Sequence, residues 1–137
     1  MFRVVEGDGP PWHTGPEFQI LHNAGHRDGQ VPMTSAGSNY AVHAPVRDVT
    51  RAVGTWNTAG LVVQGQHVEH WMNGVKLLEY QIGSLDWSER VRASKFAELP
   101  QYSLASSGHL AIQDHGDPVA FRNIKIRRLG ASRGGKN

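Results

Sequence analysis

The sequence predicts an all-β fold of short antiparallel strands with one short surface helix. Two observations favour this class: glycine accounts for 16 of the 137 residues, and several short stretches alternate apolar and polar side chains between turn residues. The net charge of +2 is too small to indicate a nucleic-acid partner, and no apolar run approaches the roughly 18 residues of a membrane span. Cysteine is absent, so disulfides and thiolate chemistry are excluded.

Alternation and turn residues predict the strands one by one. The clearest group is a three-stranded meander over residues 55–82, because Asn73-Gly74 is the strongest short hairpin signal in the chain. Within it, Glu69 and Trp71 share one face, an arrangement typical of sugar binding, although a tryptophan is as often plain core. In chain order, the expected strands are Phe2–Val5, Glu17–His22, Asn39–His43, Thr55–Gln64, His67–Met72, Val75–Ile82, His109–Gln113 and Val119–Ile126.

The surface helix is expected within Leu85–Leu99, near 86–98. Asp86 and Glu89 have the spacing of a capping box, and Pro100 marks the end of the helix.

A long loop is expected over Asn23–Ser38, and loops of such length are often functional. It carries His26 and Asp28, whose spacing suits a shared metal or proton-transfer site. The simpler interpretation is a solvated loop. Glu17 and Gln19, just before it, form a polar pair on one strand face, and solvent exposure is the simpler interpretation there too.

The stretch Gly108–Arg127 is predicted to be a hairpin with function at its tip. Its turn, Asp114–Pro118, holds two carboxylates and the imidazole of His115, which is more chemistry than a chain reversal needs. Gln113 and His115 share one side of their strand, away from the core. The alternative is an Asx-type turn in which Asp114 and Asp117 bond their own backbone.

Three runs of the sequence carry a resemblance: WHTGPEFQIL, TWNTAGLVVQGQHVEHWMNGVKLLEYQ and GHLAIQDHGDPVAFRNIKIRRL. Together they resemble the 3-keto-disaccharide hydrolase family, over nearly the whole chain from Phe2 to Leu129. The resemblance implies a concanavalin A-like lectin/glucanase sandwich, of the jelly-roll kind. Residues 1–129 would be a single β-sandwich domain, equivalent to the C-terminal part of the family domain, and residues 130–137 a disordered basic tail.

The resemblance also bears on assembly and location. Family members have further strands before the position of Phe2, so the sheet edges here are expected to be open and to pair in a homo-oligomer. Family members are commonly exported by bacteria to the periplasm or beyond, whereas no signal-peptide core is visible in this chain. The family usually has aspartate at the position of His22.

The implied activity is hydrolysis of glycosides or disaccharides whose sugar carries a ketone at C3. The ketone acidifies the C2 proton, so that a base can remove it; the C1 substituent then leaves by elimination, and water adds back. This chemistry needs one general base, one acid for the leaving oxygen and a positive group at the enolate oxygen.

Side-chain chemistry supplies candidates for these roles. His115 is the first choice for base or acid, Glu17 or His26 is the second proton carrier, and Arg122 is the cation for the enolate. The residues expected to hold the sugar are Gln19, Glu69, Trp71 and Gln113, with Trp12 and Tyr40 as stacking platforms.

The sequence identifies no particular cofactor. A divalent metal is a candidate, because Glu17, His26, Asp28 and His115 have suitable ligand atoms, but no spacing matches a defined metal motif. The alternative function is a non-catalytic carbohydrate-binding β-sandwich module, since such folds host lectins as readily as enzymes. A third interpretation is a structural fragment that assembles with a partner chain.

Overall fold

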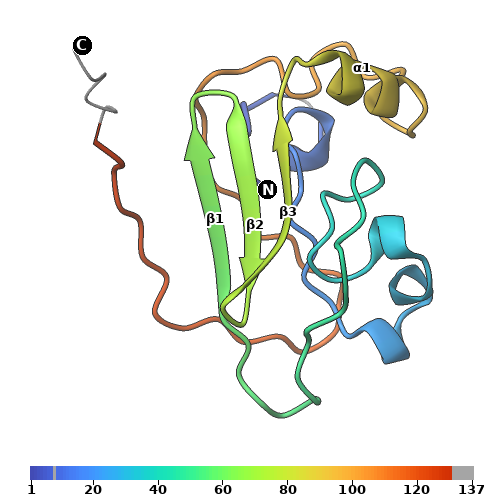
Figure 1. The fold of residues 1–137 in the computed structure, drawn as a ribbon, viewed down its shortest axis with the longest axis vertical. Coiled ribbons are helices and arrows are strands. Elements are labelled where there is room, and N and C mark those ends of the chain that lie inside the picture. The colour runs from blue at the N-terminus through green and yellow to red at the C-terminus, as the bar shows by residue number, and fades with distance from the viewer. Residues whose placement is uncertain (8, 131–137) are drawn as a thin grey trace, which may run out of the picture.

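A three-stranded antiparallel sheet forms the regular centre of the molecule (Figure 1). The computed structural model describes residues 1–7 and 9–130. Its strands are β1 (Ala59–Gln64), β2 (His67–Met72) and β3 (Val75–Gln81), in the order β1-β2-β3. The predicted meander is therefore confirmed, although its first strand begins at Ala59 and not at Thr55. Asn73 and Gly74 both have positive φ, as a two-residue type I′ turn requires.

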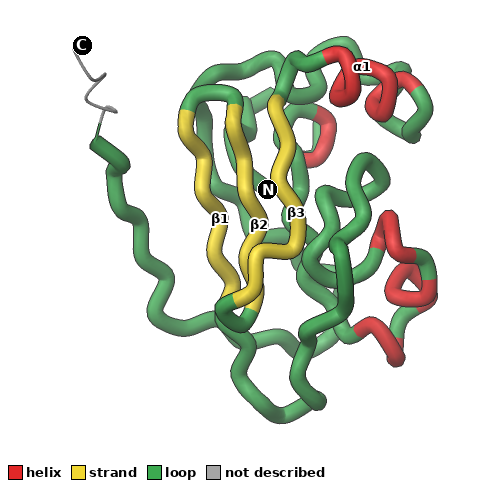
Figure 2. The backbone as a smooth tube through the Cα atoms, in the orientation of Figure 1, coloured by secondary structure: helices red, strands yellow, loops and turns green. Residues whose placement is uncertain are grey.

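The side chains of strand β2 point alternately to a buried inner face and to a more exposed outer face of the sheet. Its buried residues are Val68, His70 and Met72, and they alternate with the partly exposed His67, Glu69 and Trp71. Loops and helical turns lie beside the strands in Figure 2 and cover the inner side. The core between them is largely aromatic, and its buried members are Phe2, Val42, Val68, Leu78, Tyr80, Ile82, Trp87, Phe96 and Tyr102.

The single α-helix of the described residues, α1 (Leu85–Arg92), is fixed to the sheet by a stack of aromatic rings. Trp87 lies 5.2 Å from Tyr80 of β3, measured between ring centroids, and Tyr102 continues the stack 6.2 Å beyond Trp87. Phe96, which is 1% exposed, stacks on Tyr102 at 4.1 Å. The stack therefore joins both the helix and the segment after it to the sheet.

Both ends of α1 differ from the sequence prediction. The N-cap is Ser84, whose Oγ accepts from the Trp87 amide at 3.1 Å, while Asp86 forms an ion pair with Arg90. The helix ends at Arg92 rather than at residue 98 or 99. The hydroxyl of Ser94 causes this early end, because it donates to a backbone carbonyl and accepts a backbone amide, and so replaces helical hydrogen bonds.

The long loop at residues 23–38 contains short helical turns, as does the segment before it. The 3₁₀ turns of the described chain are Pro11–His13, Asn23–Gly25, Arg27–Gln30 and Pro32–Thr34. The Asn23 side chain holds the loop closed, because its Oδ1 accepts from the Ala36 amide at 2.8 Å. The long loop is thus a compact, internally bonded segment.

Three of the predicted strands are reduced to isolated bridges. The segments expected at 2–5, 17–22 and 39–43 pair only through Val4 with His109, Phe18 with Asn39, and Asn39 with His43. The last of these is a turn, because Ala41 has a φ of 59° and reverses the chain. Alternation of side chains indicates which face is buried, but a strand also needs a continuous neighbour, which these segments lack among the described residues.

The predicted hairpin at residues 108–127 is wrong for the described structure. Its first arm pairs with the N-terminus through His109 and Ala111, but no strand forms at 109–113 or 119–126. Most of its large apolar side chains point into solvent, with Ile126 78% and Ile112 61% exposed. The Asp114 carboxylate accepts from the Gly116 amide at 2.7 Å, which is the Asx turn of the alternative interpretation.

The fold class is confirmed in its coarser form: in the part of the chain that the structure describes, a small antiparallel sheet is the main regular element, accompanied by one α-helix. The residues described here form one sheet, so the second sheet of a sandwich remains a prediction. Within the described chain, every helix is too short or too polar to span a bilayer. The expected tail at 130–137 lies outside the described residues, apart from Gly130.

Replacing Leu77 with alanine is expected to destabilise the protein by about 2–5 kcal/mol. Leu77 is 1% exposed and packs against Ala36 and Met72, so the substitution leaves a cavity that the packed neighbours cannot fill. Leu85, which is 74% exposed, is the matched control, and Leu85→Ala should change the free energy of unfolding by less than about 0.5 kcal/mol. Urea titration of both variants measures the difference, and equal effects would contradict the described core.

Protonation of His70 is expected to limit stability in acid. Burial lowers the pKa of this imidazole from 6.5 to about 4, so the unfolded chain takes up the proton first. The free energy of unfolding is therefore highest above pH 6.5, and it falls by up to about 3 kcal/mol as the pH drops toward 4. Denaturant titrations across that range should show a steeper decline for the wild type than for His70→Gln, whereas parallel declines would show that His70 is accessible.

Candidate functional site

Five titratable side chains from distant parts of the chain gather into one group. This Glu17 cluster consists of Glu17, Asp28, Tyr40, Lys95 and His115. The carboxylate of Glu17 lies within electrostatic range of Lys95, His115 and Asp28. The Tyr40 hydroxyl donates to Asp28 Oδ2 at 2.9 Å. The structure thus brings together four candidates from the sequence, Glu17, Asp28, Tyr40 and His115, with one further residue, Lys95.

Backbone pairing places Glu17 next to Tyr40. The Tyr40 amide donates to the Glu17 carbonyl at 3.0 Å, and Gln19 exchanges bonds with Gly37 and Ser38 two residues further along. Among the described residues, the side chain of Gln19 forms no hydrogen bond with the cluster. Its role as a sugar ligand therefore remains a prediction.

The His26 turn sets the other side of the cluster. The His26 Nδ1 accepts from the Asp28 amide at 3.1 Å and caps the 3₁₀ turn that carries Asp28. The ring of His26 faces that of His115, with centroids 6.4 Å apart. Gln113 contacts His115 through its side-chain amide, as their shared strand parity predicts. Gln113 and His26 therefore flank His115 on two sides.

Burial raises the pKa of Glu17 above the ordinary range of a carboxyl group. The Met1 amino group, Lys95 and His115 oppose this shift, and Asp28 adds to it. A half-buried carboxyl group with a raised pKa holds and releases protons closer to neutral pH than an exposed one, which suits a general base. Burial, followed by the hydrogen bond to Asp28, raises the pKa of Tyr40 to about 12, so its phenol stays protonated.

Lys95 is the member of the cluster that sequence reasoning missed. Its Nζ lies 4.3 Å from the ring centroid of Tyr40, 4.9 Å from that of Trp12 and 5.2 Å from that of Phe96. The rings of Trp12 and Tyr40, both expected to stack on sugar, thus both make cation–π contacts with the ammonium group of Lys95. In the sequence Lys95 resembles any lysine of a surface helix, and the only signal is its place beside the apolar Phe96.

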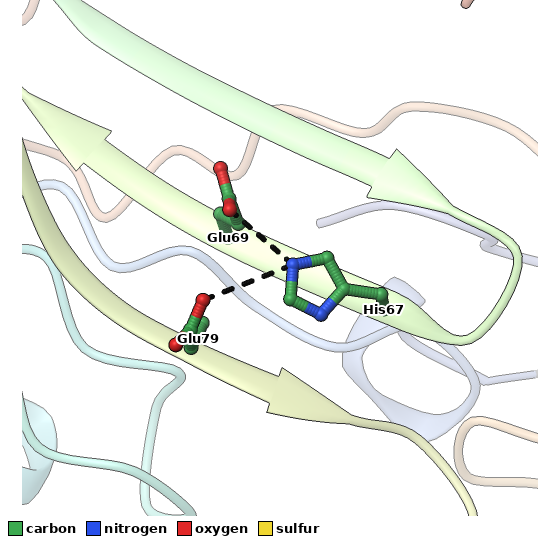
Figure 3. A group of neighbouring side chains, drawn as sticks. All are labelled: His67, Glu69 and Glu79. Atoms are coloured by element: carbon green, nitrogen blue, oxygen red, sulfur yellow. Dashed lines mark hydrogen bonds and ion pairs between the residues drawn. The ribbon is translucent and has the colours of Figure 1, made fainter. Parts of the chain in front are cut away.

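A second group occupies the outer face of the sheet. This outer-face cluster consists of His67, Glu69, Trp71, Lys76 and Glu79. In Figure 3, dashed lines join the His67 ring to Glu69 and to Glu79. The Trp71 Nε1 donates to Glu69 Oε2 at 2.7 Å, which confirms that the two lie together. This bond, and then that of His67, lowers the pKa of Glu69. Trp71 and Glu69 lie on the opposite side of β2 from its core-facing residues.

Metal ligation finds limited support in either cluster. Ligand atoms of His67, Glu69 and Glu79 lie within 4.8 Å of one another, but the Lys76 ammonium already lies 2.7 Å from Glu79 and 3.7 Å from Glu69. An ammonium group there competes with a cation for the same carboxylates. The predicted set of Glu17, His26, Asp28 and His115 does not converge on one point within the described chain.

Arg122 lies apart from both clusters. Its guanidinium carbon is 3.9 Å from the ring centroid of Trp56, and no contact joins it to the Glu17 cluster among the described residues. The role expected for it at an enolate oxygen therefore lacks structural support.

A hollow of about 630 Å³ lies between residues 5–14 and 99–105, and none of the predicted site residues lines it.

Comparison with known proteins places these residues in a family. Residues 1–127 match the model of the 3-keto-alpha-glucoside-1,2-lyase-like domain. The 3-keto-disaccharide hydrolase of Bacteroides thetaiotaomicron is 31% identical, over 88% of this chain and 46% of that protein. The crystal structure of a proposed glycosyl hydrolase from Parabacteroides distasonis is also 31% identical, with a TM-score of 0.70 over 77% of this chain and 53% of that one.

The match covers almost the whole described chain, including the Glu17 cluster. The protein belongs to the 3-keto-alpha-glucoside-1,2-lyase-like domain family, as the resemblance in its sequence indicates. The chain spans about half the length of the two relatives that it matches.

Proposed function

We propose that the protein cleaves the glycosidic bond of 3-keto-glycosides or 3-keto-disaccharides. Membership of the family supports the substrate class, because a relative is named as a 3-keto-disaccharide hydrolase. The observation that carries the proposal is the meeting of Glu17, His115 and Lys95 in one cluster. These three side chains provide the base, acid and cation that the reaction needs.

The reaction is proposed to begin with proton abstraction. Glu17 is the base that takes the proton from C2, because its half-buried carboxyl group is a stronger base than an exposed one. The electron pair left at C2 expels the substituent at C1 by elimination. His115 gives a proton to the departing oxygen, and water then adds to the C1–C2 double bond, returning hydrogen to C2 and hydroxyl to C1.

The remaining candidates hold the substrate in this scheme. His26 and Gln113 flank His115 and so fix the orientation of its ring. Tyr40, whose phenol stays protonated, is bound to Asp28 and presents its ring to Lys95. Binding of the sugar ring is assigned to the surface between Trp12 and Tyr40.

A second candidate function is carbohydrate binding without catalysis. The outer-face pair of Trp71 and Glu69 favours it, because an indole beside a carboxylate on a sheet face suits a sugar ring and its hydroxyls. In that case Trp71→Ala would abolish binding of neutral sugars, and substitutions in the Glu17 cluster would leave it unchanged.

Loss of turnover in His115→Ala is the expected outcome of the enzyme proposal. The purified protein is incubated with a 3-keto-glucoside that bears a chromogenic leaving group, and release of the chromophore is followed. Removal of the acid should lower kcat by about 10²–10⁴-fold, with KM changing little. His109→Ala is the matched control, since its side chain is 66% exposed and lies outside both clusters.

Chromophore release that persists in His115→Ala would contradict the assigned centre. Absence of release from the folded wild-type protein, combined with sugar binding that depends on Trp71, would favour the binding module instead.

We also propose that the exposed segment 110–129 associates with other copies of the chain. Ile124 and Ile126 are 66% and 78% exposed, and exposed apolar segments with high β-propensity pair readily with other chains. Sedimentation velocity over a range of concentrations should show self-association that the double substitution Ile124→Lys and Ile126→Lys removes. Val46→Lys, at a position 75% exposed elsewhere, is the control. A monomer at every concentration would contradict the proposal.

A further inference from the structure

The ammonium group of Lys95 is held in an unusual setting. The side chain is exposed, yet its Nζ lies within 5.2 Å of three aromatic ring centroids, and two of these rings, Trp12 and Tyr40, come from segments far away in the sequence. Among the described residues, no carboxylate lies within ion-pairing distance of its Nζ. Glu17 is nevertheless near enough for the charge of Lys95 to lower the pKa of its carboxyl group. The cation therefore keeps hydrogen-bond donors that are not committed to an acidic partner.

The backbone on each side of Lys95 is fixed. The Ser94 Oγ donates to the Val91 carbonyl at 2.8 Å and accepts from the Phe96 amide at 3.1 Å. Phe96 is almost fully buried and stacks on Tyr102. The flexible lysine chain is thus anchored at its root and held near its tip by cation–π contacts, which reduces the ordering that binding would otherwise require.

Proton abstraction from C2 creates a negative charge on the C3 oxygen. A preorganised cation beside that oxygen stabilises the enolate more than the neutral ketone, and so lowers the barrier. Arg122 was the candidate for this role from the sequence, but it lies over Trp56 and away from the Glu17 cluster. Lys95 is the cation that shares the cluster with the proposed base.

We propose that Lys95 binds the C3 oxygen of the substrate and stabilises the enolate that forms there. This inference rests on the function proposed above. Glu17 takes the proton from C2, the electron pair of the C2–H bond forms a C2–C3 double bond, and the charge moves to the C3 oxygen beside Lys95. The C3 carbonyl then forms again, and the electron pair of the C2–C3 double bond moves to form the C1–C2 double bond. The C1–O bond breaks at the same time, and His115 protonates the departing oxygen.

Substitution of Lys95 tests this role with a neutral and a charged replacement. Lys95→Met keeps most of the length and apolar surface but removes the charge, and is expected to lower kcat on the chromogenic 3-keto-glucoside by about 10²–10³-fold with a smaller change in KM. Lys95→Arg keeps the charge and should recover part of kcat. Lys125→Met, an exposed lysine outside the clusters, should stay within twofold of the wild type. Thermal unfolding of each variant identifies any loss that is due only to folding.

Binding of ascorbate separates this inference from the proposed function. Ascorbate is a stable ene-diolate anion derived from a sugar, and methyl glucoside is its neutral comparison. Calorimetry should show that Lys95→Met weakens ascorbate binding at least tenfold, while Lys125→Met has no effect and binding of methyl glucoside is the same in all three proteins.

A wild type that turns over the substrate, with Lys95→Met equally active, would overturn the role of Lys95 and leave the proposed function intact. A folded wild type without turnover would reject the proposed function, and Lys95-dependent ascorbate binding would then retain Lys95 as an oxyanion site. Ascorbate binding that is absent, or equal in the wild type and Lys95→Met, would overturn the role of Lys95 in either case.

Discussion

The buried imidazole of His70 connects the sheet to the segments that carry the Glu17 cluster. Its Nδ1 lies 3.1 Å from the Gly37 carbonyl, its Nε2 lies 3.3 Å from the Tyr80 hydroxyl, and its ring stacks on Phe18 at 4.4 Å. A carbonyl can only accept, so Nδ1 carries the proton and Nε2 accepts from Tyr80. Gly37 has a φ of 91°, and a side chain there would collide with Leu77. The neutral imidazole of His70 is therefore needed to bond both groups, and glycine is needed at position 37 to avoid this collision.

The geometry of the Glu17 cluster follows from this connection. Phe18, held on His70, fixes the neighbouring Glu17, and the Gly37 segment leads directly to Tyr40, whose amide bonds the Glu17 carbonyl. The aromatic stack from Tyr80 to Phe96 brings Lys95 to the same place from the other side. Charges of opposite sign thus meet at the edge of the core, where the half-buried Glu17 lies near the exposed side chains of Lys95 and His115. Such a position lets one carboxyl group and one ammonium group act on the same ligand.

The sequence predicts those elements that a local pattern of residues specifies, but not those that depend on neighbours from distant parts of the chain. The meander at β1 to β3 was predictable because Asn73-Gly74 and regular alternation specify it within a few residues. The hairpin expected at 109–126 was not formed, because alternation does not supply a pairing partner. Arg122, which belongs to that segment, lies over the ring of Trp56, and its role at the enolate oxygen stays a prediction. Glu17, Tyr40 and His115 were selected for their chemistry, whereas Lys95 is distinguished only by rings that the fold brings to it.

The most direct test of the proposed chemistry is the hydrogen isotope at C2 of the product. The reaction is run in D₂O with a 3-keto-glucoside, and the released sugar is analysed by NMR before the ketone exchanges its neighbouring protons spontaneously. Hydrogen at C4, which also flanks the ketone but takes no part in elimination, is the internal reference. Proton abstraction and hydration predict deuterium at C2 and protium at C4. Protium at both positions would mean that the bond is hydrolysed directly, and would contradict the roles assigned to Glu17 and Lys95.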